Sequence, residues 1–171
     1  ASLLGPDAAP GTPEFDLFVR EVVNEMTVKA GQKCTAIRRA MAPAEHLDAV
    51  EDAIRDRLAR TQVGDPRAEG TRMGALVNRA QKEDVKQRIA EIAAAGARVV
   101  AGDPEAQVGP DGGAFLQPVL LRADDPWTCE AAHDVEPFGP VSTIMPYKDL
   151  TDAVRLANRG RGSLALSLFT H

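Results

Sequence analysis

Residues 12–43 of this chain read TPEFDLFVREVVNEMTVKAGQKCTAIRRAMAP and contain the pattern that decides its fold. Thr12-Pro13 is typical of a helix start, because a hydroxyl caps free backbone N–H groups and proline lacks the N–H that a first turn leaves unpaired. Apolar side chains then recur every three or four residues over 15–26, which gives the predicted helix one apolar face. Gly31 predicts the end of that helix, since glycine readily adopts left-handed backbone conformations. The residues that follow, 35–43, favour a short strand.

Alternation of helices and strands continues along the rest of the chain. Further helices are expected from about residue 43 to 60, from 78 to 96 and from about 150 to 158, and further strands at 98–101, 115–121, 141–145 and 164–169. Asn78 and Gln81 have the spacing of a capping box. Gly, Pro and Asp in residues 64–76 and 102–113 are typical of irregular connections. This order predicts an α/β fold with a mostly parallel sheet.

The composition limits the classes of protein to which the chain can belong. Its 171 residues suit one domain, and its 44% hydrophobic content is enough for a core. A net charge of −5 and a pI near 5.2 argue against binding to nucleic acid or to an anionic membrane. No apolar run has the length of a membrane span, and the first residues lack the pattern of a signal peptide. Two cysteines without a disulfide framework favour a reducing compartment, so we expect a cytoplasmic protein.

Cys34 lies on the connector between the first helix and the first strand, where substrate can reach a thiol that rigid elements hold in place. The other cysteine, Cys129, is far away in sequence, so neither a CxxC redox pair nor a metal site is indicated. One alternative is a buried Cys34 with a packing role only. Another is a nucleophile pair of Cys34 with His133, although His133 can equally be a surface histidine. Cys129 and Trp127 are expected to be packing residues in a helical turn.

Four segments of the chain, in the same order, resemble the aldehyde dehydrogenase family. The segments are residues 21–36, which hold Cys34; residues 63–66 with 73–76; Glu136-Pro137-Phe138-Gly139-Pro140-Val141; and residues 152–158 with Gly162 and 164–170. They resemble, in turn, the catalytic-cysteine signature, a conserved middle segment, a second signature, and the helix and strand that close the catalytic domain. Because they cover nearly the whole chain, the resemblance is highly specific.

This resemblance implies a three-layer catalytic domain over residues 1–171, with an open, mostly parallel sheet and flanking helices. It implies that Cys34 is the nucleophile that forms a thiohemiacetal with an aldehyde, and that the backbone N–H of Cys34 binds the oxyanion. It also implies that Glu136 binds the nicotinamide ribose of NADP or NAD, with Phe138 beside the nicotinamide. From the residues alone, Glu136 can equally be a solvated loop acid and Phe138 a packing residue.

In the family, a general-base glutamate, an oxyanion asparagine and the nucleotide-binding domain precede the segment that this chain resembles. We therefore expect the chain to be a catalytic-domain fragment that binds cofactor mainly through segments absent here. Such a fragment should fold, because its helices and strands carry consistent apolar faces. It should also expose patches of apolar side chains and be inactive by itself.

Residues 29–39 and 159–164 look most like one subgroup, the dehydrogenase part of the bifunctional enzymes of phenylacetate degradation. That likeness implies fusion to a MaoC-type hydratase that opens an oxepin-CoA ring. It implies NADP-linked oxidation of a CoA-thioester semialdehyde, 3-oxo-5,6-dehydrosuberyl-CoA semialdehyde, to the carboxylate by a homo-oligomer. The semialdehyde dehydrogenase of the benzoyl-CoA pathway is the nearest alternative. A Cys-dependent hydrolase or acyl-transfer domain and a noncatalytic folding or interaction module are alternatives from other classes.

Overall fold

The alternating pattern folds into a six-stranded sheet in the computed structural model, which describes residues 1–171. The strands lie in the order β3-β4-β5-β2-β1-β6. Their bounds are Ser2–Leu4 for β1, Arg39–Pro43 for β2, Arg98–Ala101 for β3, Val119–Arg122 for β4, Val141–Tyr147 for β5 and Ser167–Phe169 for β6. Every neighbouring pair is parallel except β3 with β4. The predicted mostly parallel α/β sheet is therefore confirmed.

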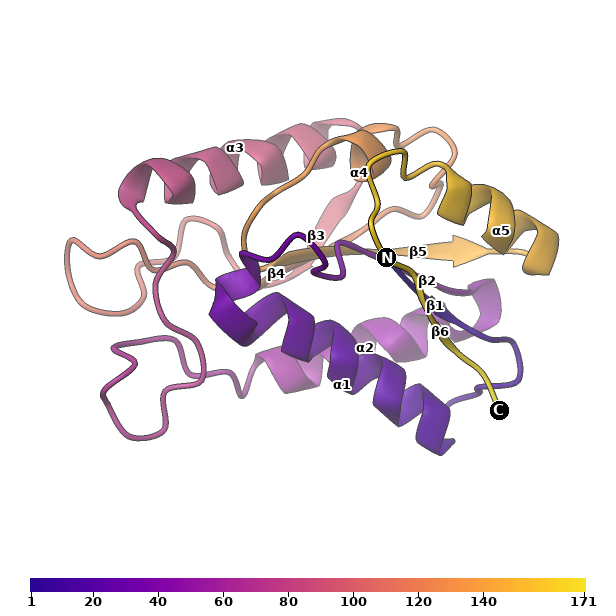
Figure 1. The fold of residues 1–171 in the computed structure, drawn as a ribbon, viewed down its shortest axis with the longest axis horizontal. Coiled ribbons are helices and arrows are strands. Elements are labelled where there is room, and N and C mark those ends of the chain that lie inside the picture. The colour runs from indigo at the N-terminus through magenta and orange to yellow at the C-terminus, as the bar shows by residue number, and fades with distance from the viewer.

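Helices cover both faces of the sheet and complete three layers (Figure 1). One face carries α1, Pro13–Thr27, and α2, Leu47–Leu58; the other carries α3, Arg79–Ala94, the short α4, Ala131–Asp134, and α5, Leu150–Asn158. Two 3-10 turns, η1 at Val28–Gly31 and η2 at Ala44–His46, follow α1 and precede α2. Each face has its own buried apolar cluster, because strand side chains alternate between the two faces.

Side-chain caps begin α1 and α3 where the sequence predicts helix starts. Thr12 Oγ1 accepts a hydrogen bond from the Phe15 N–H at 3.3 Å, and Asn78 Oδ1 accepts one from the Gln81 N–H at 2.8 Å. The Gln81 side chain does not return the bond to Asn78 but donates to the Phe138 carbonyl at 3.0 Å. The capping box is therefore half formed, because its glutamine is used in a tertiary contact.

The region between α1 and β2 differs most from the sequence prediction. The α-helix ends at Thr27, because Lys29 and Ala30 already have left-handed φ values of 54° and 51°. Gly31, with φ of 68°, completes this left-handed run instead of ending the α-helix directly. The strand begins only at Arg39, after a turn at residues 34–35, although the Arg38 carbonyl already accepts a hydrogen bond from the Thr143 N–H of β5 at 2.8 Å.

Other boundaries shift because strand pairing, which the sequence pattern does not report, sets the ends of the strands. β4 and β6 begin at Val119 and Ser167, later than the expected residues 115 and 164. The α-helix expected from about residue 43 begins at Leu47, after η2. β1 and α4 were not predicted, since they contain only 3 and 4 residues and so show no periodicity.

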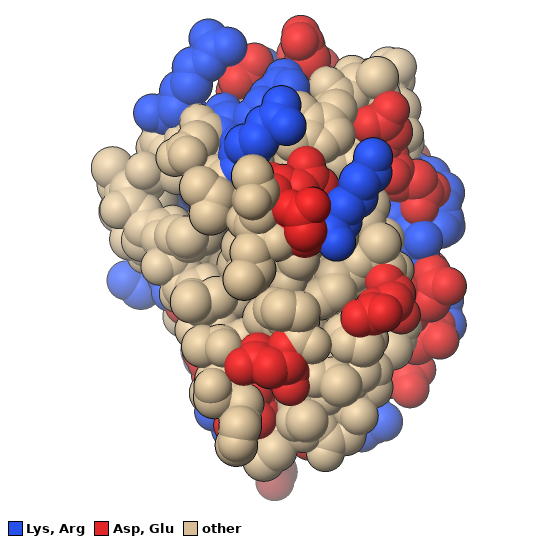
Figure 2. Space-filling view, turned by 90° about the vertical axis from the view of Figure 1, so that its right-hand side faces the viewer, with Lys and Arg blue, Asp and Glu red and all other residues tan.

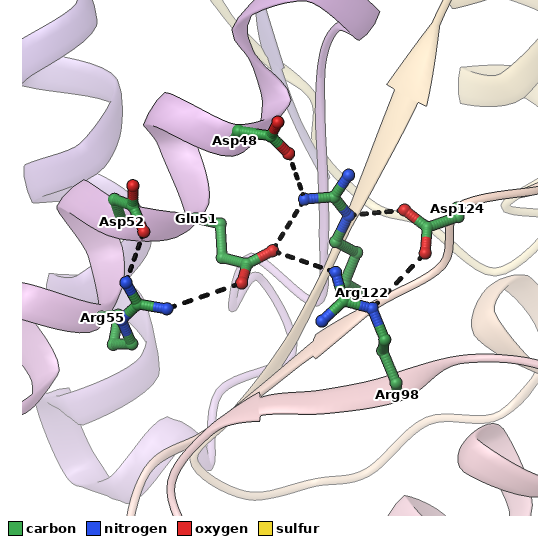
Figure 3. A network of polar contacts seen from close by, with 7 residues as sticks. All are labelled: Asp48, Glu51, Asp52, Arg55, Arg98, Arg122 and Asp124. Carbon is green, nitrogen blue, oxygen red and sulfur yellow. Dashed lines mark hydrogen bonds and ion pairs between the residues drawn. The ribbon is translucent and has the colours of Figure 1, made fainter.

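A network of ion pairs ties α2 to the antiparallel edge of the sheet (Figure 3). At its centre Glu51, 8% exposed, accepts a hydrogen bond from Arg122 of β4 at 2.8 Å and pairs with Arg98 of β3 at 3.5 Å. Arg122 also bonds to Asp48 and Asp124, each at 2.6 Å. Burial alone would lower the pKa of Arg122, but the hydrogen bonds to these three carboxylates outweigh burial and raise that pKa. The network holds α2 in place on the sheet.

The surface is mixed in character. Figure 2 shows basic and acidic side chains interspersed on one face, with wide areas that carry neither charge. None of the helices combines the length and the apolar character that crossing a membrane requires. At the β6 edge Leu164, Leu166 and Leu168 are 72%, 52% and 60% exposed. Apolar side chains are thus exposed at this edge, as the sequence leads us to expect.

Candidate active site

Cys34 lies in the turn between η1 and β2, and its side chain is exposed. It lines a cleft of about 210 Å³ together with the segment 132–136 and residues 161–165. The cleft therefore brings Cys34 and Glu136 together, although Phe138 does not line it. The alternative in which Cys34 is a buried packing thiol is wrong.

The backbone before Cys34 is held in an unfavourable conformation by its neighbours. Left-handed φ values cost non-glycine residues such as Lys29 and Ala30 roughly 1–2 kcal/mol each, so the surrounding structure must hold this turn. Gly31 is required for a further reason, because a β-carbon there would lie 2.1 Å from the Gly139 carbonyl oxygen. This contact sets the turn that carries Cys34 directly against the loop that carries Glu136.

Two side chains beside Cys34 hold the same turn from other directions. Gln32 Oε1 accepts a hydrogen bond from the Val77 N–H at 3.0 Å, and its amide nitrogen donates to the Lys29 carbonyl at 3.0 Å. Lys33 Nζ binds Glu25 Oε1 of α1 at 2.6 Å. The Lys33 ammonium is thus engaged with α1, and the turn is tied both to α1 and to the segment before α3.

Glu136 faces the cleft with its side chain 60% exposed. Its Oε1 lies 3.0 Å from Nη2 of Arg38, and its other oxygen has no partner within the chain. The Arg38 guanidinium also lies over the Phe138 ring, 5.4 Å from the ring centre, and Nη2 donates to the Lys33 carbonyl at 2.7 Å. Burial lowers the pKa of Arg38, and Glu136 acts in the opposite direction.

Arg39 joins the walls of the cleft. Its side chain is buried and donates to the Leu156 and Ala157 carbonyls at the end of α5, at 2.9 and 3.2 Å. It also donates to Ser163 Oγ at 3.0 Å. Gly160 makes room for this guanidinium, since a β-carbon there would lie 1.7 Å from Arg39 Nη2.

Neither Arg38 nor Arg39 was singled out as a site residue from the sequence. The signal available was two consecutive arginines in a segment that otherwise reads as an apolar strand, where charged side chains are rarely buried without partners. Their partners lie up to 124 residues away in the chain, and no local pattern identifies them.

His133 is unsuited to act as the base of a Cys–His pair. Its Nε2 lies 2.8 Å from the Pro126 carbonyl, which can only accept, and its Nδ1 lies 3.1 Å from Arg39 Nη1, which can only donate. Both ring nitrogens of the neutral imidazole are therefore engaged. Burial lowers the pKa of His133, and Arg39 and Arg159 lower it further. His133 is half-buried and lines the cleft, so it lies at the surface only in part.

Trp127 and Cys129 are packing residues, as expected. Arg155 and Arg159 lie 4.9 and 5.6 Å from the centre of the Trp127 ring, which holds the turn before α4 against α5. Cys129 is 2% exposed and belongs to the apolar cluster beneath α3, α4 and α5. Nowhere do three or more His, Cys, Asp or Glu side chains converge as metal ligands.

Comparison with known proteins identifies the family. The sequence profile described as "Aldehyde dehydrogenase family" matches residues 11–171. The chain belongs to the aldehyde dehydrogenase family. It is 50% identical over 99% of its length to 3,4-dehydroadipyl-CoA semialdehyde dehydrogenase of Aromatoleum evansii, of which it covers 34%. It is also 46% identical over 57% of its length to Protein MaoC of Klebsiella aerogenes, of which it covers 29%.

Solved structures of the family share this fold. Aldehyde dehydrogenase C of Pseudomonas syringae, determined with NAD+ and octanal, matches 99% of the chain with a TM-score of 0.85 at 26% identity, and the chain covers 34% of that structure. Betaine aldehyde dehydrogenase of Staphylococcus aureus, determined with NAD+, matches 99% of the chain with a TM-score of 0.83 at 25% identity, and 33% of it is covered. The chain thus spans about a third of the length of the family members that it matches.

Proposed function

We propose that this chain is the catalytic domain of a longer NAD(P)-dependent aldehyde dehydrogenase that oxidises a CoA-thioester semialdehyde to the carboxylate. The observation that carries this proposal is the shared cleft, which both the exposed Cys34 and Glu136 line. The family match supports the reaction type, and the relative at 50% identity supports the CoA-linked semialdehyde.

Cys34 supplies the nucleophile. Its thiolate adds to the aldehyde carbon and forms a thiohemiacetal, and oxidation of this adduct leaves a thioester on the same sulfur. Water then cleaves the thioester, which releases the carboxylate and the free thiol. The Cys34 backbone N–H makes no hydrogen bond within the chain, so it is available to the oxyanion of the thiohemiacetal.

Glu136 fits the role of a ligand for the nicotinamide ribose. Glu136 lines the cleft and only its Oε1 is paired with Arg38, and a carboxylate accepts hydrogen bonds from hydroxyl groups well. Phe138 is half-buried two residues further along, beside Arg38, where its ring can border the nicotinamide. NAD(P), when bound, supplies the hydride acceptor for the oxidation. We propose NADP as the preferred cofactor, on the likeness of residues 29–39 to the phenylacetate subgroup.

Two CoA-linked substrates are candidates. The same likeness favours 3-oxo-5,6-dehydrosuberyl-CoA semialdehyde from phenylacetate degradation, with fusion to a MaoC-type hydratase, and the match to Protein MaoC supports it. The second candidate, 3,4-dehydroadipyl-CoA semialdehyde, is favoured by the relative at 50% identity. A homo-oligomer in the cytoplasm is part of the same proposal.

The test is steady-state oxidation of both semialdehydes by the full-length enzyme, with NADP and with NAD. We expect NADPH formation with at least one of them, and its loss in Cys34→Ala while any hydratase activity persists, because the two sites lie on separate domains. The ratio of kcat/KM for the two substrates decides between them. Dehydrogenase turnover in Cys34→Ala would overturn the proposal.

A further inference from the structure

We propose that Arg38 is a positioning residue for the cofactor, which holds the Glu136 carboxylate at the place where the nicotinamide ribose binds. This inference rests on the proposed function and adds to it a residue outside the aldehyde dehydrogenase signatures described above. It begins from the position of Arg38, which contacts both loops of the site.

Arg38 is anchored on the cysteine side. Its Nη2 donates to the Lys33 carbonyl at 2.7 Å, one residue before Cys34. The side chain is only 15% exposed, so its conformation is restricted by the groups packed around it. The Phe138 ring beneath the guanidinium supports it from the other loop, at 5.4 Å.

From this anchor, Arg38 reaches one oxygen of Glu136. The Nη2–Oε1 distance is 3.0 Å, and the Glu136 side chain is 60% exposed and makes no other ion pair. An exposed acid without this partner would sample several rotamers, each of which must be given up when a ribose binds. Because Arg38 takes one oxygen only, the second oxygen is left for the ribose hydroxyls.

The position of the Arg38 guanidinium also leaves one of its hydrogen-bond donors unsatisfied, which is unfavourable for stability. Arg38 Nε is buried and has no hydrogen-bond acceptor. An unsatisfied buried donor is unfavourable by about 1–3 kcal/mol, so a side chain selected for stability alone would avoid this arrangement. A role in holding Glu136 accounts for its placement.

The other contacts of the cysteine turn make Arg38 separable from it. Gln32 and Lys33 bind Val77 and Glu25, and Gly31 packs on Gly139, all without Arg38. Loss of the Arg38 side chain should therefore release Glu136 while Cys34 stays in place.

The experiment compares Arg38→Met and Arg38→Lys with the parent in the full-length enzyme. In Arg38→Met the KM for NAD(P) should rise about tenfold, because Glu136 loses its ion pair with Arg38 and the binding of the ribose must then order the carboxylate, while the alkylation rate of Cys34 by iodoacetamide changes less than about twofold. Arg38→Lys keeps the charge, so its KM for NAD(P) should lie between that of the parent and that of Arg38→Met. Arg88→Met is the matched control, because Arg88 of α3 pairs only with Asp84 and Glu91. It should leave the KM for NAD(P) and the alkylation rate of Cys34 unchanged.

Dependence on Glu136 is the decisive feature. In a Glu136→Ala background, Arg38→Met should have little additional effect on the KM for NAD(P), because the group it positions is gone. The inference would be overturned if Arg38→Met left the KM for NAD(P) unchanged, or if it raised that KM as much in the Glu136→Ala background as in the parent. A rise in the KM accompanied by slower alkylation of Cys34 would also overturn it. The proposed function fails separately, through activity in Cys34→Ala.

Discussion

Gly31 and Gly139 touch backbone to backbone, so closely that a β-carbon on Gly31 would lie 2.1 Å from the Gly139 carbonyl oxygen. One glycine precedes the turn that carries Cys34, and the other follows the loop that carries Glu136 and Phe138. The proposed reaction needs the thiol and the cofactor to be held within about 0.5 Å of their productive positions. The lack of a side chain on Gly31 is what lets these loops approach so closely, whereas a β-carbon on Gly139 would instead meet the Val85 side chain at 2.6 Å.

Gly31→Ala should therefore destabilise the chain by at least about 3 kcal/mol, since it combines a left-handed φ with a backbone collision. Gly11→Ala is the matched control, because Gly11 also has a positive φ, 93°, but nothing lies within 4 Å of its β-carbon position. It should cost only about 1 kcal/mol. Urea unfolding of the two variants checks the difference, and equal losses would mean that the contact is unimportant.

Gly160→Ala should disrupt the Arg39 contacts that join the cleft walls, since its β-carbon would meet the buried guanidinium. Displacing a buried cation from its partners should cost about 2–4 kcal/mol. Gly162→Ala, two residues on, has open space around its β-carbon position and should cost less than about 1 kcal/mol. Thermal unfolding distinguishes the two, and a tolerated Gly160→Ala would contradict the role given to Arg39.

Because of His133, the free energy of unfolding should decrease as the pH falls. Its pKa is lowered in the folded state by burial and by Arg39 and Arg159, which outweigh the opposite effects of the hydrogen bond to the Pro126 carbonyl and of Asp134. The unfolded chain therefore binds the proton more readily, so the stabilisation is complete above about pH 6.5 and is lost as pH falls through the lowered pKa.

The measurement is the free energy of unfolding at pH 7.5 and pH 5 in the parent, in His133→Gln and in His171→Gln, whose histidine is exposed at the chain end. The fall between the two pH values should shrink in His133→Gln and persist in His171→Gln. The same fall in all three proteins would show that His133 is not responsible.

Arg122→Met should unfold the chain more readily, because Glu51 would lose its closest cation while remaining buried. Arg98 and Arg55 stay within 3.5 and 3.7 Å of Glu51, so we expect a loss of about 2 kcal/mol rather than the larger cost of a fully orphaned charge. Arg20→Met, which removes only the exposed pair with Glu21, should change stability by less than about 0.5 kcal/mol. Equal losses of stability in the two variants would show that the ion-pair network does not hold α2 on the sheet.

Local chemistry made much of the fold predictable. The caps at Thr12 and Asn78 and the strand at 98–101 all follow from short-range preferences, and the structure agrees with them. Cys34 was identified as accessible because a connector between two rigid elements usually is.

Contacts between distant segments were not predictable in the same way. Nothing near Gly31 indicates that Gly139 will pack against it, and the partners of Arg38 and Arg39 depend on the order of strands in the sheet. The same reason explains the late start of β2, since a strand begins where it finds a neighbour and not where its residues become apolar.

The central claim is that Cys34 forms the covalent bond to substrate. The most direct measurement is mass spectrometry of the full-length enzyme, quenched in acid within milliseconds after mixing with the CoA-linked semialdehyde and NAD(P), and then digested with trypsin. Cleavage after Lys33 and Arg38 isolates Cys34 in a five-residue peptide, residues 34–38. We predict the acyl mass on that peptide and its absence in Cys34→Ala. An acyl group on another residue, or NAD(P)H formation by Cys34→Ala, would contradict the account.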